Sequence, residues 1–210
     1  MAEKVTGRLI SIEGIDGAGK STQVARLVAH LDQQGHHTIA TREPGGAPGA
    51  EDIRRLLVEG DPGRWSAETE ILLFTAARRD HLECRIQPAL ADGHIVITDR
   101  FADSTRVYQG AVRADLSEMV DTLHRLMIGI EPDLTIIIDM DPDEALSRGL
   151  ARNSGEDRFE DMGAAFQRAL RAGFLALAAA NPNRCKLVDG NRDADAIAAD
   201  IAALADKLLS

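Results

Sequence analysis

The sequence predicts a three-layer α/β/α fold, with helices on both faces of a five-stranded parallel sheet, as in P-loop kinases. Short apolar segments of four to six residues recur along the chain, separated by longer stretches with helical periodicity. Strands joined by such long crossovers pair in parallel, because tight hairpins cannot connect them. Hydrophobic residues make up 44% and charged residues 28% of the 210 positions, which is typical of a globular protein.

Each element is predicted from its own local signals. The five strands share a short apolar core with Gly, Pro or polar residues at their ends, and they are Arg8–Glu13, Thr38–Thr41, His94–Asp99, Leu134–Asp139 and Lys186–Asp189. Helices are predicted over Ser21–Gln33, from Ser66 to Asp92, and over the Ala-rich segment Asp193–Leu209. Several strands end in polar residues, which predicts the functional site at the carboxyl edge of the sheet.

No repeat or Pro/Gly/Ser-rich linker divides the chain, so we expect a single domain over residues 1–210. The polar stretch Asn153–Asp157 lies between two helical segments, and it predicts a short lid over about 148–160.

Composition argues against several classes of protein. The formal net charge is −10 and no basic run exceeds two residues, so no nucleic acid partner is expected. The longest apolar run, Phe174–Ala180, is far shorter than the roughly 18 residues of a membrane span, so no membrane partner is expected. Cys84 and Cys185 form no metal-binding motif, and no apolar signal segment precedes Gly14, which together predict a cytoplasmic protein.

Residues 14–21 match the phosphate-binding pattern G-x-x-x-x-G-K-[ST], between a predicted strand and a predicted helix. Backbone N–H groups of such a loop surround phosphates, and the helix N-terminus adds positive potential. Lys20 would reach the β- and γ-phosphates, and Ser21 would hold Mg²⁺. The predicted ATP contacts are Gly14, Ile15, Asp16, Gly17, Ala18, Gly19, Lys20, Ser21 and Thr22.

The loop alone does not define the reaction. No N-K-x-D motif supports a GTPase, and no additional lysine in the loop supports a partition ATPase. These exclusions favour a compact kinase that acts on a small acceptor.

Four further motifs follow the loop: TREPGG at 41–46, LFTAAR at 73–78, DRF at 99–101 with Ser104-Thr105 and Tyr108-Gln109-Gly110, and DRFE at 157–160. On these motifs the chain resembles the bacterial thymidylate (dTMP) kinases nearly end to end. The resemblance implies phosphoryl transfer from ATP to dTMP, giving dTDP and ADP, with Mg²⁺ as cofactor. It also implies a homodimer.

The spacing of Phe74 and Arg78 puts both on one face of a predicted helix. An aromatic ring and a guanidinium there can stack on a pyrimidine and donate to its carbonyl. The alternative is an ordinary core phenylalanine and a solvated arginine. The resemblance favours the base pocket.

Arg100, directly after a predicted strand, can hold the acceptor phosphate bidentately. The resemblance implies that Tyr108 crowds the sugar 2′ position and that Thr105 or Ser104 contacts the thymine edge. The full set of implied dTMP contacts is Asp16, Glu43, Pro44, Phe74, Arg78, Arg100, Ser104, Thr105, Tyr108 and Gln109.

A carboxylate such as Asp16 is unusual beside phosphates. The resemblance implies that Asp16 contacts the acceptor 3′-hydroxyl and the surroundings of Mg²⁺. Together with Ser21 of the phosphate loop, Asp16 is therefore a predicted metal residue. Some family members carry an arginine where this chain has Gly17. Arginines flanking the lid would then replace it. The predicted catalytic residues are Lys20, Arg100, Arg148, Arg152 and Arg158.

Alternatives remain open at this point. Arg148 and Arg152 could line a solvated helix face. The enzyme could be another nucleoside monophosphate kinase or a deoxynucleoside kinase, in which Glu43 would serve as the base for a neutral hydroxyl. A nucleotide-sensing switch that binds ATP without turnover is a further possibility. Phe101 and Arg106 depart from the usual family pattern, away from the central chemistry.

Overall fold

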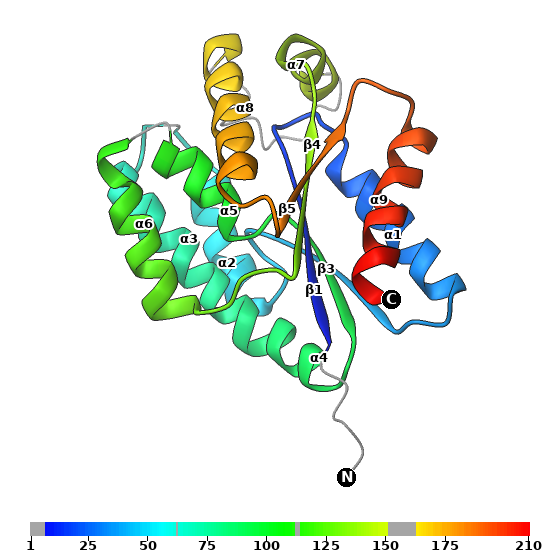
Figure 1. Cartoon of the computed structure of the whole chain (residues 1–210). Coiled ribbons are helices and arrows are strands. Elements are labelled where there is room, and N and C mark those ends of the chain that lie inside the picture. The colour runs from blue at the N-terminus through cyan, green and yellow to red at the C-terminus, as the bar shows by residue number, and fades with distance from the viewer. Residues whose placement is uncertain (1–6, 62, 112–113, 151–162) are drawn as a thin grey trace.

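Figure 1 shows the computed structural model, which describes residues 7–61, 63–111, 114–150 and 163–210. Five strands form one parallel sheet in the order β2-β3-β1-β4-β5. Their bounds are β1 (Arg8–Glu13), β2 (Thr38–Arg42), β3 (Ile95–Asp99), β4 (Leu134–Asp139) and β5 (Cys185–Asp189). The predicted fold class is confirmed, and each strand end lies within one residue of its prediction.

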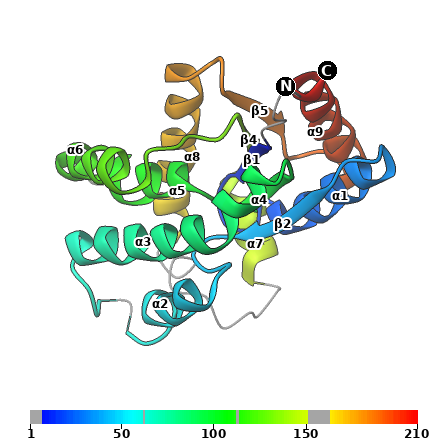
Figure 2. The same cartoon turned by 90° about the horizontal axis from the view of Figure 1, so that it is seen from below.

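Helices cover both faces of the sheet, as Figures 1 and 2 show from two directions. One face carries α1 (Lys20–Gln33) and α9 (Ala194–Leu209), and the other carries α3 (Ala67–His81), α4 (Gln87–Ala91), α5 (Ala102–Thr105), α6 (Ser117–Leu123) and α8 (Gly163–Ala180). Helix α2 (Pro48–Val58) packs on α3. The remaining elements are the π-helical turns η1 (Leu82–Ile86), η2 (Arg106–Ala111) and η4 (His124–Ile128), the 3₁₀ turn η3 (Ala114–Leu116), and α7 (Pro142–Leu150).

The predicted helices exist with small differences. The stretch expected to be one helix from Ser66 to Asp92 is α3, η1 and α4 in succession, so a π-helical turn interrupts it. Ser66 caps α3, because its hydroxyl accepts a hydrogen bond from the amide of Thr69 at 3.2 Å. Asp193 caps α9 in the same way. Helices α7 and α8 flank the predicted lid, whose central residues lie outside the described part of the chain.

Strand β1 is central and almost wholly buried. Ile10 and Ile12 belong to the core on the side of α1 and α9, while Leu9 packs with residues of η1, α4 and α5 on the other side. Because successive side chains of a strand alternate between faces, Ser11 and Glu13 lie on the same side as Leu9. The sequence therefore places two polar side chains inside the protein, close to the carboxyl edge.

The carboxyl ends of the strands meet at one edge of the sheet, the upper edge in Figure 1. The phosphate loop follows β1, Glu43 follows β2, and Arg100 follows β3. Parallel sheets bind ligands at this edge, so the fold brings the predicted site residues together. Among the described residues, no helix is long and apolar enough to cross a membrane.

Candidate active site

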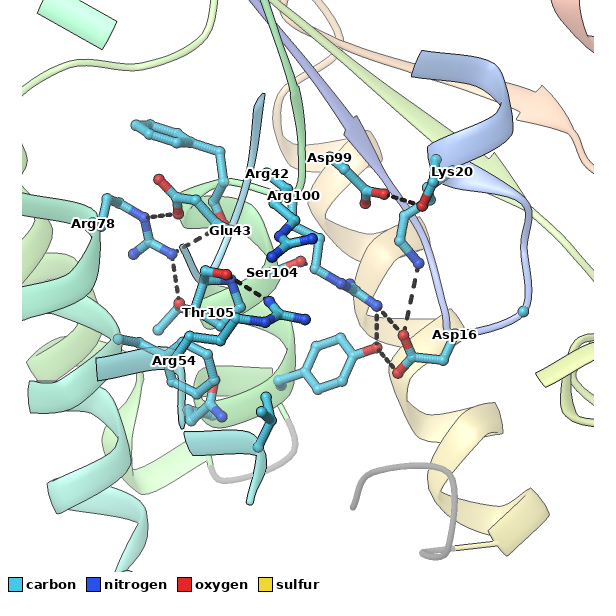
Figure 3. A pocket seen from close by; sticks show the side chains of 18 residues that line it. Asp16, Lys20, Arg42, Glu43, Arg54, Arg78, Asp99, Arg100, Ser104 and Thr105 are labelled. Atoms are coloured by element: carbon cyan, nitrogen blue, oxygen red, sulfur yellow. Dashed lines mark hydrogen bonds and ion pairs between the residues drawn. The ribbon is translucent and has the colours of Figure 1, made fainter. Parts of the chain in front are cut away.

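A cavity of about 310 Å³ lies at this edge, between the phosphate loop and helices α2, α3 and α5 (Figure 3). Every residue predicted to contact dTMP lines it, although these residues come from four separate parts of the chain. Gly17, Lys20 and Ser21 of the phosphate loop line the same cavity. The geometry therefore places a phosphate-binding loop directly beside a pocket for a second small molecule.

The phosphate loop runs from β1 into α1, with Gly19 at the N-cap of the helix. Lys20 is the first residue of α1. It is buried, with only 7% of its surface exposed, and Nζ donates to the carbonyl of Ile15 at 2.9 Å. Nζ also lies 3.8 Å from Asp16 Oδ1. Burial first and the neighbouring Arg100 second lower the pKa of Lys20.

Gly17 is required by close packing against α7. Its φ is 83°, and a Cβ at this position would lie 1.9 Å from the carbonyl oxygen of Ala145. No side chain fits there without moving the backbone of α7. The loop of this chain therefore has no room for an arginine at residue 17.

Asp16, Arg100 and Tyr108 form one polar cluster inside the cavity (Figure 3). Arg100 Nη2 is ion-paired with Asp16 Oδ1 and donates to the Tyr108 hydroxyl at 3.0 Å, and that hydroxyl donates to Asp16 Oδ2 at 2.8 Å. Burial alone would raise the pKa of Asp16, but Arg100 and then Lys20 outweigh it, and the pKa falls to about 2. The cluster keeps Asp16 ionised and holds Arg100 over the cavity.

Glu43 and Arg78 form a buried ion pair on the opposite side of the cavity. Arg78 Nε donates to Glu43 Oε2 at 2.6 Å, and the second oxygen, Oε1, lies 3.0 Å from His81 Nδ1. Arg78 Nη2 donates to Thr105 Oγ1 at 3.0 Å and to the carbonyl of Phe101 at 3.2 Å. Both oxygens of Glu43 are thus engaged, which disfavours the alternative in which Glu43 acts as a general base.

The comparisons with known proteins agree with this geometry. A family model described as thymidylate kinase matches residues 12–201. The chain is 72% identical to the thymidylate kinase of Dinoroseobacter shibae over 197 residues, which cover 94% of this chain and 95% of that one. It is 66% identical to the thymidylate kinase of Jannaschia sp. over 201 residues, covering 96% and 97% of the two chains.

The chain belongs to the thymidylate kinase family. The crystal structure of thymidylate kinase from Ehrlichia chaffeensis has the same fold, with a TM-score of 0.77 and 32% identity over 96% of this chain and 99% of that one. Family membership makes the chain an ATP-dependent nucleoside monophosphate kinase that phosphorylates dTMP to dTDP. The nucleotide-sensing switch and the deoxynucleoside kinase are therefore set aside.

Five residues of the cavity were not among the predicted site residues: Arg42, Arg54, Val58, Asp99 and Phe101. Asp99 accepts a hydrogen bond from Ser21 Oγ at 2.6 Å. Its place at the end of a strand beside the phosphate loop could have identified it as a site residue from the sequence. Arg54 and Val58 come from α2, a helix that the sequence analysis did not predict. Phe101 was expected to lie away from the chemistry, yet it lines the cavity and its carbonyl holds Arg78.

The lid arginines are only partly described. Arg148 lies on α7 with about half of its side chain exposed, 3.6 Å from Glu144 one turn earlier. This contact fits the alternative of a solvated helix face. Arg152 and Arg158 lie outside the described residues, so their assignment remains a prediction.

The oxygen donors beside the phosphate loop fit magnesium, which prefers hard oxygen ligands. Ser21 Oγ and the Asp99 carboxylate lie together, whereas both oxygens of Asp16 are already engaged by Arg100 and Tyr108. Within the described ranges, no group of three or more His, Cys, Asp or Glu side chains could hold a metal. A magnesium ion here would therefore take several of its ligands from nucleotide phosphates, as is usual in kinases.

Proposed function

We propose that transfer to dTMP takes place in the described cavity, with the phosphate loop holding ATP and Arg100 holding the acceptor phosphate. The observation that carries this proposal is the position of Arg100, which lies between the phosphate loop and the base pocket (Figure 3). Asp16 and Tyr108 engage Nη2 of its guanidinium, and Ser104 and the carbonyl of Gly14 engage Nη1. This fixes the group, and Nε can donate a charge-assisted hydrogen bond to a dianion.

The base of dTMP is proposed to lie between Phe74 and the buried Arg78. Phe74 supplies an apolar surface, and the guanidinium of Arg78 supplies a donor for a thymine carbonyl. Glu43 and Thr105 hold that guanidinium in place, so the pocket is ordered before the ligand arrives. Tyr108, packed edge-on against Phe166 and Phe174, is proposed to stand beside the sugar.

The proposed mechanism is alignment with charge neutralisation. The second pKa of a phosphate monoester is about 6, so the attacking oxygen of dTMP is ionised at neutral pH and no general base is needed. Lys20, Arg100 and the lid arginines stabilise the negative charge on the transferred phosphoryl group. Mg²⁺ is the proposed cofactor; when bound by Ser21, with Asp99 close by, it would neutralise charge on the β- and γ-phosphates.

Replacing Arg78 with alanine tests the base pocket. We expect the KM for dTMP to rise by roughly ten- to a hundredfold, because a donor to the ligand is lost and Glu43 is left without its partner. The KM for ATP should change by less than about twofold. Steady-state kinetics with each substrate varied in turn measures both values.

Arg85→Ala is the matched control for Arg78, because Arg85 lies in η1, is exposed and does not line the cavity. It should leave both KM values within about twofold of the unchanged protein. Equal rises of the two KM values in Arg78→Ala would remove Arg78 from the acceptor pocket.

We also propose that the chain acts in the cytoplasm as a homodimer, as the family resemblance implies. Large apolar side chains are exposed on neighbouring elements of one side of the molecule: Leu72 of α3, Met119 of α6, and Leu126 and Met127 of η4. Leu126 is 66% exposed, which is unfavourable for an isolated apolar side chain in water. A second copy that covers this side would remove these side chains from water.

Sedimentation analysis at micromolar concentration tests the dimer. The unchanged protein should sediment at twice the mass of the chain, and Leu72→Glu together with Leu126→Glu should give the mass of one chain. Leu187→Glu is the control, since Leu187 is also exposed but lies in β5, away from α3, α6 and η4. A monomeric unchanged protein, or a double variant that stays dimeric, would contradict the proposed interface.

A further inference from the structure

Glu13, the last residue of β1, is a fully buried carboxylate that was not among the predicted site residues. It lies beneath the carboxyl edge, on the face of the sheet that α5 covers, and it does not line the cavity. Burial first, and the neighbouring Asp103 second, raise its pKa to about 7. Burying a carboxylate is unfavourable unless hydrogen-bond donors compensate for the lost water. The donors that contact Glu13 therefore indicate which segment of the chain it holds in place.

Three donors converge on this carboxylate. The amide of Phe101 donates to Oε1 at 2.7 Å, the Ser104 hydroxyl donates to Oε2 at 2.6 Å, and the Ser11 hydroxyl donates to Oε1 at 2.9 Å. Two of these donors belong to the segment that directly follows Arg100. Glu13 therefore holds this segment by two hydrogen bonds, one to each carboxylate oxygen.

The backbone at Arg100 needs such support. Its φ is 69°, and no other non-glycine residue in the described part of the chain has a positive φ. A left-handed conformation at a residue with a side chain persists only where the surroundings hold it. The Arg100 amide donates to the carbonyl of Ile12 at 3.0 Å, its carbonyl accepts from the Thr98 hydroxyl at 2.8 Å, and the next amide is the one bound by Glu13.

The side chain of Arg100 is held through the same carboxylate. Ser104 Oγ, which donates to Glu13, also accepts a hydrogen bond from Arg100 Nη1 at 2.9 Å. A hydroxyl has one hydrogen, and because Ser104 donates it to Glu13 Oε2, its lone pairs are free to accept from the guanidinium. Glu13 thus supports the turn at Arg100 and, through Ser104, one of the contacts that direct its side chain.

We propose that Glu13 is a positioning residue for the acceptor phosphate. It acts through Ser104 and the Phe101 amide, and it orients Arg100 without touching either substrate. This inference rests on the proposed role of Arg100 in holding the phosphate of dTMP.

Glu13→Gln is the direct test, because it keeps the shape and replaces one accepting oxygen by a donor. A glutamine has one accepting oxygen in place of two, so it cannot keep both the Phe101 and the Ser104 contacts unchanged, and the support of Arg100 through Ser104 is weakened. We expect the KM for dTMP to rise by roughly ten- to a hundredfold, while the KM for ATP changes by less than about twofold. A merely structural role would instead lower the melting temperature and the active fraction, with the KM for dTMP unchanged.

Ser11→Ala is the matched control. It removes the third hydrogen-bond donor to the Glu13 carboxylate, and Ser11 is as fully buried as Glu13. Among the described side chains, Ser11 makes no hydrogen bond to Arg100 or Ser104. Its KM for dTMP should stay within about threefold of that of the unchanged protein. An effect as large as that of Glu13→Gln would overturn the proposal, since loss of buried polar contacts in general would then explain both.

A double-mutant cycle with Ser104→Ala tests the route of the coupling. If Glu13 acts through Ser104, the two substitutions should be strongly non-additive, and Glu13→Gln should cost far less in the Ser104→Ala background. Additive effects would overturn the route. Should Glu13→Gln not fold, Glu13→Asp carries the same test, because the shorter carboxylate keeps the charge but cannot reach both donors.

Arg100→Ala separates the inference from the function on which it rests. If Arg100→Ala raises the KM for dTMP and Glu13→Gln does not, the positioning role is wrong and the proposed role of Arg100 stands. If Arg100→Ala leaves the KM for dTMP unchanged, the proposed phosphate contact is itself wrong. The expected result is a higher KM for dTMP in both Arg100→Ala and Glu13→Gln, while the KM of Ser11→Ala stays near that of the unchanged protein.

Discussion

Replacing Lys20 with alanine is expected to lower kcat by on the order of 10³-fold or more while the protein remains folded. Lys20 is the cation of the phosphate loop, and its Nζ lies within the loop itself, bound to the carbonyl of Ile15. In the alanine variant, the Lys20 ammonium group would no longer stabilise the negative charge that develops on the transferred phosphoryl group in the transition state. Single-turnover kinetics with dTMP in excess measures the chemical step.

The burial of Lys20 makes a second variant necessary. Alanine removes the apolar stem as well as the charge, whereas Lys20→Met keeps most of the stem and removes the charge alone. Both variants should lose kcat alike, and melting temperatures should show both to be folded. A Lys20→Met variant that retains more than about a third of kcat would contradict the assignment of the phosphate loop.

Arg152→Ala is expected to lower kcat by on the order of 10²–10⁴-fold, with little change in either KM. Gly17 packs against α7 so closely that the loop cannot supply an arginine, and the transferred group must then receive its donor from elsewhere. Arg152 follows α7 by two residues in the sequence, and the family resemblance assigns such arginines to the lid. A contact that forms mainly in the transition state changes kcat rather than KM.

Arg152→Lys provides the control for charge alone. It should rescue poorly, because an ammonium group cannot replace the planar guanidinium fork. Arg148→Ala and Arg158→Ala should be measured beside it. If all three alanine variants keep more than about a third of kcat where chemistry limits turnover, the lid-arginine hypothesis is wrong.

Most of the fold could be predicted because its signals are local. The strand β4 is a run of apolar residues introduced by Pro132, and the phosphate loop marks the junction of β1 and α1. Helix α2 was missed because it follows a Gly- and Pro-rich segment that reads as a loop. The π-helical turn η1 was also missed, since its sequence continues the helical pattern of α3.

The residues that line the cavity could be predicted, but their contacts could not. Phe74 and Arg78 were predicted from helical spacing with the family resemblance, and Arg100 from its place after a strand; all three line the cavity. The pairing of Glu43 with Arg78, and the burial of Lys20, depend on segments far apart in the sequence. No local pattern specifies such contacts, and the same limit applies to Glu13, whose partners Phe101 and Ser104 lie 88 and 91 residues away.

The most direct test of the central claim is ADP release from ATP and Mg²⁺, measured against a panel of acceptors. The panel contains dTMP, the other common nucleoside monophosphates, and thymidine as the neutral counterpart of dTMP. The structure predicts rapid release with dTMP, with kcat/KM at least roughly a hundredfold above that of purine monophosphates and of thymidine. Release that does not depend on dTMP, or that is as fast with thymidine, would contradict a pocket built to hold a phosphate through Arg100.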